Sequence, residues 1–122
     1  MSALQFIFGL HNHQPVGNFD GVFADAYDKA YLPFLDLLEV YPGFRVALHH
    51  TGPLLVWIAD NRPEYLERLG ALVHRDQVEL LGGAFYEAIL PVIPEKDRIG
   101  QITMMSNWLE KIFEVRPRGM WL

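Results

Sequence analysis

Two histidines follow an apolar stretch near the start of the chain. The stretch, residues 6–10, has no polar side chain, and His11 and His13 come directly after it, before Pro15 ends any strand. An apolar run of this kind is typical of a strand buried on both faces of a parallel sheet. Residues two apart on an extended backbone point the same way, so the two imidazoles face one side. Because α/β folds place ligands at the carboxyl ends of their strands, this pair predicts a ligand site.

The next two candidate strands carry similar polar groups. His49 and His50 end an apolar segment, and because they are adjacent they point to opposite faces, so at most one joins a site. Glu79 lies inside the apolar segment 78–81, where a buried carboxylate is costly unless it is paired or hydrogen-bonded. In a closed barrel, Glu79 would point at the same cavity as the histidines of the first strand.

Further aromatic and acidic groups lie close to the same predicted rim. Phe85, Tyr86 and Glu87 follow the third strand candidate, and Trp121 lies in the last one. Apolar faces combined with a few fixed polar groups suit sugar rings, because a sugar ring has surfaces of both kinds. By sequence alone, packing is the more ordinary role of Trp121.

Two chemistries fit the histidine pair. A His-x-His at the end of a first strand is the arrangement with which metal-dependent hydrolases on barrels hold zinc or a similar ion, and His49 or His50 could supply another ligand. In the other interpretation the imidazoles bind sugar hydroxyls while carboxylates do the acid–base work. Glycoside chemistry needs two carboxyl groups flanking the bond, about 5 Å apart for retention. Composition and spacing leave both interpretations open.

Helical patterns separate the strand candidates, which are residues 4–10, 44–48, 78–81 and 119–122. The intervening segments predict a helix over 25–41 with Asp25 as its N-cap, helices starting at Gly52 and Pro63, and a long helix over about 95–115. Strands alternating with helices indicate an α/β fold of parallel βαβ units. Because a closed (β/α)8 barrel takes about 250 residues, these 122 residues are expected to form the first half of a barrel, ending at its fourth strand.

The composition is that of a globular protein. Hydrophobic residues make up 51% of the chain and aromatic residues 13%, which argues against disorder. The net charge of -5 argues against a nucleic-acid partner, and the lack of cysteine excludes disulfides and a thiolate nucleophile. The N-terminus lacks the basic region of a signal peptide, and no apolar run approaches the roughly 18 residues of a membrane span. We therefore expect a cytoplasmic protein without a membrane partner.

Three segments carry a family resemblance. Residues 6–15, Phe-Ile-Phe-Gly-Leu-His-Asn-His-Gln-Pro, resemble the first signature region of glycoside hydrolase family 57. Residues 77–90, beginning Gln-Val-Glu-Leu-Leu-Gly-Gly, look like its second region, and residues 119–122, Gly-Met-Trp-Leu, look like the opening of its third. The segments occur in the family's order and approximate spacing. Within the family, the chain is most similar to the 4-α-glucanotransferases of heat-loving archaea and bacteria, which share the segments 17–19 and 52–54.

The resemblance implies a TIM-like (β/α)7 barrel and a retaining attack on α-1,4-glucosidic bonds that needs neither metal nor cofactor. It implies that His11, His13 and Glu79 hold the sugar beside the scissile bond, and that Trp121 lines the groove. The family's nucleophile, a Glu just after the Trp-Leu of the third region, and its acid/base, a more distant Asp, lie outside these 122 residues. Because losing such groups costs many powers of ten in rate, the chain alone is expected to be inactive.

The expected partners are an α-1,4-glucan or maltooligosaccharide and the C-terminal half of the barrel, with no nucleic acid. A half barrel exposes sheet edges and an open apolar interior, so the chain alone is expected to form a homodimer or to aggregate. One alternative is a stand-alone carbohydrate-binding or assembly half-barrel. The other is the metal-dependent hydrolase built on His11 and His13.

Overall fold

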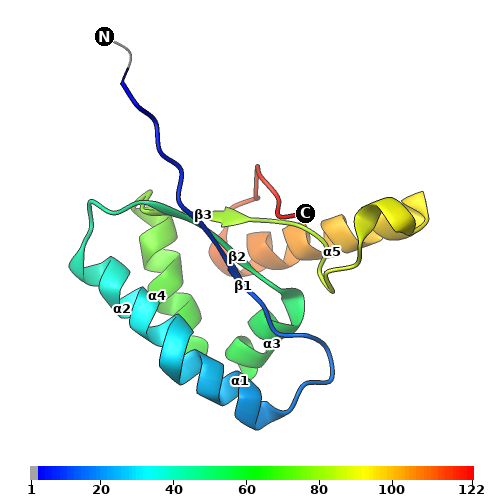
Figure 1. Ribbon diagram of the computed structural model, residues 1–122, viewed down its shortest axis with the longest axis horizontal. Coiled ribbons are helices and arrows are strands. Elements are labelled where there is room, and N and C mark those ends of the chain that lie inside the picture. Colours follow the sequence, from blue (N-terminus) through cyan, green and yellow to red (C-terminus); the bar gives the residue numbers. More distant parts are fainter. Residues whose placement is uncertain (1–2) are drawn as a thin grey trace.

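A three-stranded parallel sheet forms the centre of the molecule. In the computed structural model, which describes residues 3–122, the strands β1 (Gly9–Asn12), β2 (Val46–His50) and β3 (Val78–Leu81) lie side by side in chain order. Both pairings are parallel, and helices connect the strands (Figure 1). The prediction of an α/β fold built from parallel βαβ units is therefore confirmed for these three strands.

Seven helical segments accompany the strands in the described residues: α1 (Asp20–Ala26), the π-helical turn η1 (Tyr27–Tyr31), α2 (Leu32–Val40), α3 (Gly52–Asn61), α4 (Pro63–His74), the 3-10 turn η2 (Leu90–Val92) and α5 (Glu95–Phe113). Figure 1 shows α1 to α4 gathered on one side of the strands and α5 extending away toward the right of the view. Within residues 3–122, none of the helices has both the length and the apolar character that crossing a membrane requires.

The register sorts the strand side chains onto two faces, because paired residues in a sheet point the same way. The core face, turned toward α1 to α4, carries Leu10, Asn12, Leu48, His50, Val78 and Leu80. The opposite face, called the site face below, carries Gly9, His11, Ala47, His49, Glu79 and Leu81. The predicted divergence of the two adjacent histidines of β2 is thus confirmed.

Helix α4 illustrates how the core forms. Its buried side chains recur at helical spacing, as the sequence predicts: Tyr65, Leu66, Leu69, Leu72 and Val73. They join a continuous cluster with apolar residues of α1 to α3 and of the core face. Burial of such side chains, at about 1.5–3 kcal/mol each, fixes the helices against the sheet.

The first helix differs from the prediction. It begins at Asp20 rather than at Asp25, because Phe23 is already buried and stacks on Trp57 of α3, at 5.5 Å between ring centroids. The π-helical turn lies just before Pro33, which has no N–H for an α-helical hydrogen bond. The segment is therefore a continuous helical stretch with an irregular middle turn.

Both ends of the predicted strand set are shorter than expected. The first strand begins at Gly9, and the preceding Phe6 and Ile7 are 79% and 86% exposed, so the prediction of a strand buried on both sides is wrong for them. β1 pairs with β2 alone, and no described segment covers its other edge. The predicted strand 119–122 is reduced to one parallel bridge between Met120 and Gly82.

Candidate functional site

The site face forms one wall of a cavity at the carboxyl ends of the strands. The cavity, with a volume of roughly 530 Å³, is lined by His11, His49, Glu87 and Trp121, together with residues 88–91. These residues come from two strands, the loop after β3 and the C-terminal segment. Strand ends converge at one edge of a parallel sheet, so the fold brings together groups that are far apart in the chain.

A carboxylate joins the two histidines that the sequence singles out. Glu87 Oε1 lies 2.8 Å from His11 Nε2, and Glu87 Oε2 contacts His13 Nδ1. The Glu87 backbone has a φ of 53°, in the left-handed region that costs a non-glycine residue about 1–2 kcal/mol, and its N–H donates to the Ala84 carbonyl at 3.1 Å. The turn thereby holds the Glu87 side chain against the ends of β1.

The imidazole of His49 also belongs to this cluster, because it contacts the ring of His11. The two Nδ1 atoms lie 2.8 Å apart, and the Trp121 ring stacks on His11 with 4.7 Å between centroids and 4° between planes. A side chain at Gly83 would meet the Trp121 carbonyl oxygen at 2.8 Å and His49 Nε2 at 3.3 Å, and the φ of Gly83 is +148°. Only glycine fits there, so the second glycine of the Gly-Gly pair lets these rings approach the backbone closely.

His49 is neutral at pH 7. Burial, with smaller contributions from the neighbouring His11 and His13, lowers its pKa to about 4. The side chain is almost fully buried, and its Nε2 has no hydrogen-bond partner among the described residues. A neutral imidazole has one N–H and one bare nitrogen, so the site contains an imidazole that acts as a hydrogen-bonding group rather than as a charge.

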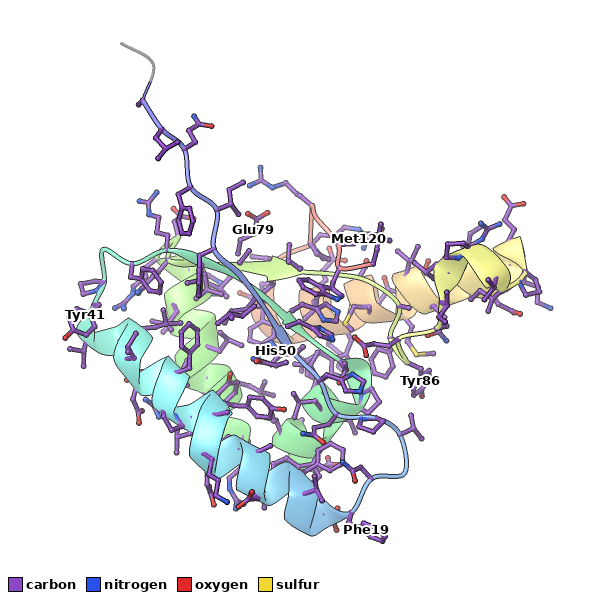
Figure 2. All side chains as sticks on the ribbon, viewed as in Figure 1. Phe19, Tyr41, His50, Glu79, Tyr86 and Met120 are labelled. Carbon is purple, nitrogen blue, oxygen red and sulfur yellow. The ribbon has the colours of Figure 1, made fainter. Side chains whose placement is uncertain are left out.

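The structure brings together three of the four residues predicted for the site: His11, His13 and Trp121. Glu79 lies on the same face but opposite Ala47, further from the carboxyl end of the strands than His49. It lines a separate hollow with Arg116 and Arg118, and Figure 2 shows it on the other side of the strands from His50. Within this chain Glu79 therefore does not line the cavity of the histidines, and its role in sugar binding stays a prediction.

Glu87 and His49 complete the site, although neither residue is singled out in the sequence as strongly as His11 and His13 are. The sequence places Glu87 among the acidic groups near the rim, but nothing in its neighbours predicts the left-handed turn that aims it. For His49, the alternation of side chains along a strand shows that at most one of His49 and His50 faces the site, but it does not show which one. The core face takes His50, which leaves His49 for the site.

The same side chains form a possible ligand set for a metal ion. One ligand atom from each of His11, His13 and Glu87 lies within 4.8 Å of the others. Two imidazole nitrogens and one carboxylate oxygen match the donor set of catalytic zinc sites, which keep a further position open. In the described geometry these atoms hydrogen-bond to one another.

A comparison with protein families gives one match over almost the whole chain. The family described as Glycosyl hydrolase family 57 matches residues 7–122. An alpha-amylase of Pyrococcus furiosus is 53% identical over 120 residues, which are 98% of this chain and 18% of that protein. A 4-alpha-glucanotransferase of Thermococcus litoralis is 45% identical over 122 residues, all of this chain and 18% of that protein. The chain thus spans about a fifth of the length of these relatives.

Solved structures agree with the sequence comparison. The crystal structure of the Thermococcus litoralis 4-alpha-glucanotransferase superposes with a TM-score of 0.96, over all of this chain and 19% of that one. A branching enzyme of Thermococcus kodakaraensis, solved in complex with glucose, superposes with a TM-score of 0.77 at 17% identity, over 95% of this chain and 32% of that one. The second likeness shows a shared fold.

Proposed function

Because this chain belongs to glycosyl hydrolase family 57, we propose that it supplies the N-terminal part of the sugar-binding surface in a retaining enzyme that acts on α-1,4-glucans. The observation that carries the proposal is the convergence of His11, Glu87 and Trp121 on one cavity, with His13 in contact with the Glu87 carboxylate. Relatives named alpha-amylase and 4-alpha-glucanotransferase support the assignment of a glucan as the substrate.

The chemistry of the cavity suits a neutral sugar. Sugar hydroxyls both donate and accept hydrogen bonds, and the Glu87 carboxylate and the nitrogens of His11 and His13 offer partners of both kinds. Indole and the apolar residues 88–91 provide the flat, dry surface against which the C–H face of a pyranose packs. In the proposed function, Trp121 lines the groove, and Glu79 helps to hold the sugar beside the scissile bond.

The chemical step is proposed to depend on residues outside this chain. Retaining glycoside chemistry requires a nucleophilic carboxylate and an acid/base about 5 Å apart across the bond. The carboxylate of the cavity, Glu87, is held by two imidazoles, which leaves it poorly placed to attack. The chain alone is therefore expected to bind but not to cleave glucan.

We further propose that the sheet is the first part of a (β/α)7 barrel, with the C-terminal part of the enzyme covering the site face. The share of the relatives that the chain spans, 18–19%, supports this proposal. Several apolar side chains are exposed before β1, after β3 and at the C-terminal end of the described residues: Leu4, Phe6, Ile7, Ile89, Val92 and Leu122. An apolar surface of this kind favours association, so the isolated chain is expected to pair with the C-terminal part or with a second copy.

The direct test is binding of maltoheptaose to the 122-residue chain, followed by amide NMR. We expect shifts at His11, His13, Glu87 and Trp121, and a five- to tenfold weaker affinity for His13→Ala, because a lost hydrogen bond is worth about 1 kcal/mol. His74→Ala, at an exposed histidine of α4, serves as the control and is expected to bind like the original chain. Shifts confined to other surfaces would refute the proposal.

A second experiment tests the expected inactivity. Disproportionation of maltotriose is measured with the chain alone and with the chain mixed with the C-terminal part of a relative. Activity in the mixture only is the expected result, and activity of the chain alone would overturn the assignment of the chemical step to other residues.

The ligand set of His11, His13 and Glu87 favours one alternative, a metal-dependent hydrolase. Zinc titration by calorimetry distinguishes the two functions. Stoichiometric binding that is lost in His13→Ala would support the metal alternative, whereas maltoheptaose binding in the presence of a chelator supports the sugar site.

A further inference from the structure

Among the described residues, Glu87 is the carboxylate in contact with both predicted histidines. We infer that Glu87 is a positioning residue that determines which ring nitrogen carries the proton in His11, in His13 and, through His11, in His49. The inference follows from the contacts of the two carboxylate oxygens with His11 Nε2 and His13 Nδ1.

The proton positions follow one by one. A carboxylate only accepts hydrogen bonds, so His11 carries its proton on Nε2 and His13 carries its proton on Nδ1. A neutral His11 then has a bare Nδ1, which lies 2.8 Å from His49 Nδ1. One of these two atoms must donate, and it is His49 Nδ1. Since His49 has a single proton, its Nε2 is bare, and this is the buried nitrogen without a partner among the described residues.

The backbone around Glu87 is built to keep the carboxylate in place. The two residues before the left-handed turn at Glu87 are anchored: the Phe85 carbonyl accepts from Gly52 N–H at 2.8 Å, and Tyr86 N–H donates to Gln101 Oε1 at 2.9 Å. A Cβ at Gly52 would lie 2.3 Å from the Phe85 ring, so the start of α3 and the loop after β3 are in close contact. The loop therefore presents Glu87 from a fixed base, as a positioning residue requires.

A consequence follows for the ligand, and it rests on the proposed function. With its Nδ1 proton directed to Glu87, His13 offers a bare Nε2 on a half-exposed side chain. A bare nitrogen accepts a hydrogen bond, so it recognises a donor such as a sugar hydroxyl. The adjacent carboxylate repels anions. The site is therefore selective for neutral sugars over sugar phosphates or uronic acids of the same size.

The test of the positioning role is nitrogen-15 NMR of the imidazoles in the 122-residue chain, which distinguishes N–H from bare nitrogens. We expect protonated Nε2 in His11 and protonated Nδ1 in His13 and His49. In Glu87→Gln the amide has one acceptor and one donor end, so only one of the two imidazoles keeps an acceptor for its N–H, and the other is expected to exchange its protonated nitrogen. Glu67→Gln, at an exposed glutamate of α4, is the matched control and leaves all three imidazoles unchanged.

The outcomes are separable. A different protonated nitrogen in His11 or His13 of the original chain overturns the inference without any variant, and so does an unchanged pattern in folded Glu87→Gln. The ligand consequence is tested with maltoheptaose, for which Glu87→Gln is expected to lose about tenfold in affinity and Glu67→Gln nothing. If no form of the chain binds the sugar, the proposed function fails while the imidazole pattern still decides the role of Glu87.

Discussion

His49 and His50 are neighbours in one strand, yet they belong to different parts of the molecule. His50 lies on the core face, 3% exposed, where its Nε2 is within hydrogen-bonding distance of Asn12 Nδ2, at 3.1 Å, and of the Tyr65 hydroxyl oxygen, at 3.0 Å. His49 lies on the site face, 1% exposed, where Nδ1 meets His11 and Nε2 has no partner among the described residues. The two histidines are therefore about equally buried, but only His50 has hydrogen-bond partners for its Nε2 among the described residues.

The difference separates a structural histidine from a functional one better than burial does. Buried polar groups are nearly always hydrogen-bonded, because an unmade bond costs about 1–3 kcal/mol. His50 follows this rule and ties β1 and β2 to α4. His49 does not follow this rule. It lies beside the cavity and stacks with the rings of His11 and Trp121, and these neighbours hold it in place despite the unmade hydrogen bond.

The largest expected effect is on stability in acid. Burial lowers the pKa of His50 to about 3, below the value of about 6.5 of an imidazole in the unfolded chain. Between these values the unfolded chain binds a proton that the folded chain does not, so stability falls as the pH falls from about 6.5 toward 3. The slope reaches about 1.4 kcal/mol per pH unit for this group. Urea unfolding at several pH values measures it.

His49 sharpens the same experiment, since burial also lowers its pKa, to about 4. Replacing either histidine with phenylalanine is expected to make the acid slope shallower, with the larger change for His50. An acid slope that is the same in both variants and in the original chain would show that carboxylates, rather than the two imidazoles, govern acid unfolding.

The second-largest expected effect is the loss of stability when His50 on the core face is replaced. His50→Phe keeps the ring volume but leaves the Tyr65 hydroxyl and the Asn12 amide without their partner. The expected loss is about 2–3 kcal/mol of unfolding free energy, because buried donors are left unpaired. Thermal unfolding measures the loss, and His74→Phe at the exposed end of α4 controls for the change of residue type. A loss below 0.5 kcal/mol, roughly the effect of a surface substitution, would contradict the structural role of His50.

The comparison also explains what the sequence could predict. Apolar runs and helical periodicity predict β3, α4 and the parallel arrangement of the strands. They do so because burial of the apolar face of each helix and of the sheet dominates the free energy of folding. Alternation along β2 predicts that the two histidines diverge. The family resemblance adds the positions of His11, His13 and Trp121 at one site.

The remaining features depend on contacts between distant segments. The edge of β1 and the exposure of Phe6 and Ile7 are set by which strand lies alongside, which residues 6–10 alone do not specify. The aim of Glu87 depends on a left-handed turn that few non-glycine residues adopt. The distance between Glu79 and the histidines depends on the register of three strands, which a shift of two residues would change without altering any face.

The smallest expected effect on stability comes from the site side. His49→Phe removes the unpaired Nε2 together with the hydrogen bond to His11, so gain and loss nearly offset one another, and the unfolding free energy is expected to change by less than about 1 kcal/mol. The site changes more. His11 Nδ1 loses the hydrogen bond to His49 Nδ1. The nitrogen-15 chemical shift of His11 Nδ1 is therefore expected to differ between His49→Phe and the original chain. An unchanged shift, with stability lost to the same extent as in His50→Phe, would place both histidines in the same structural role and remove the distinction between the two faces.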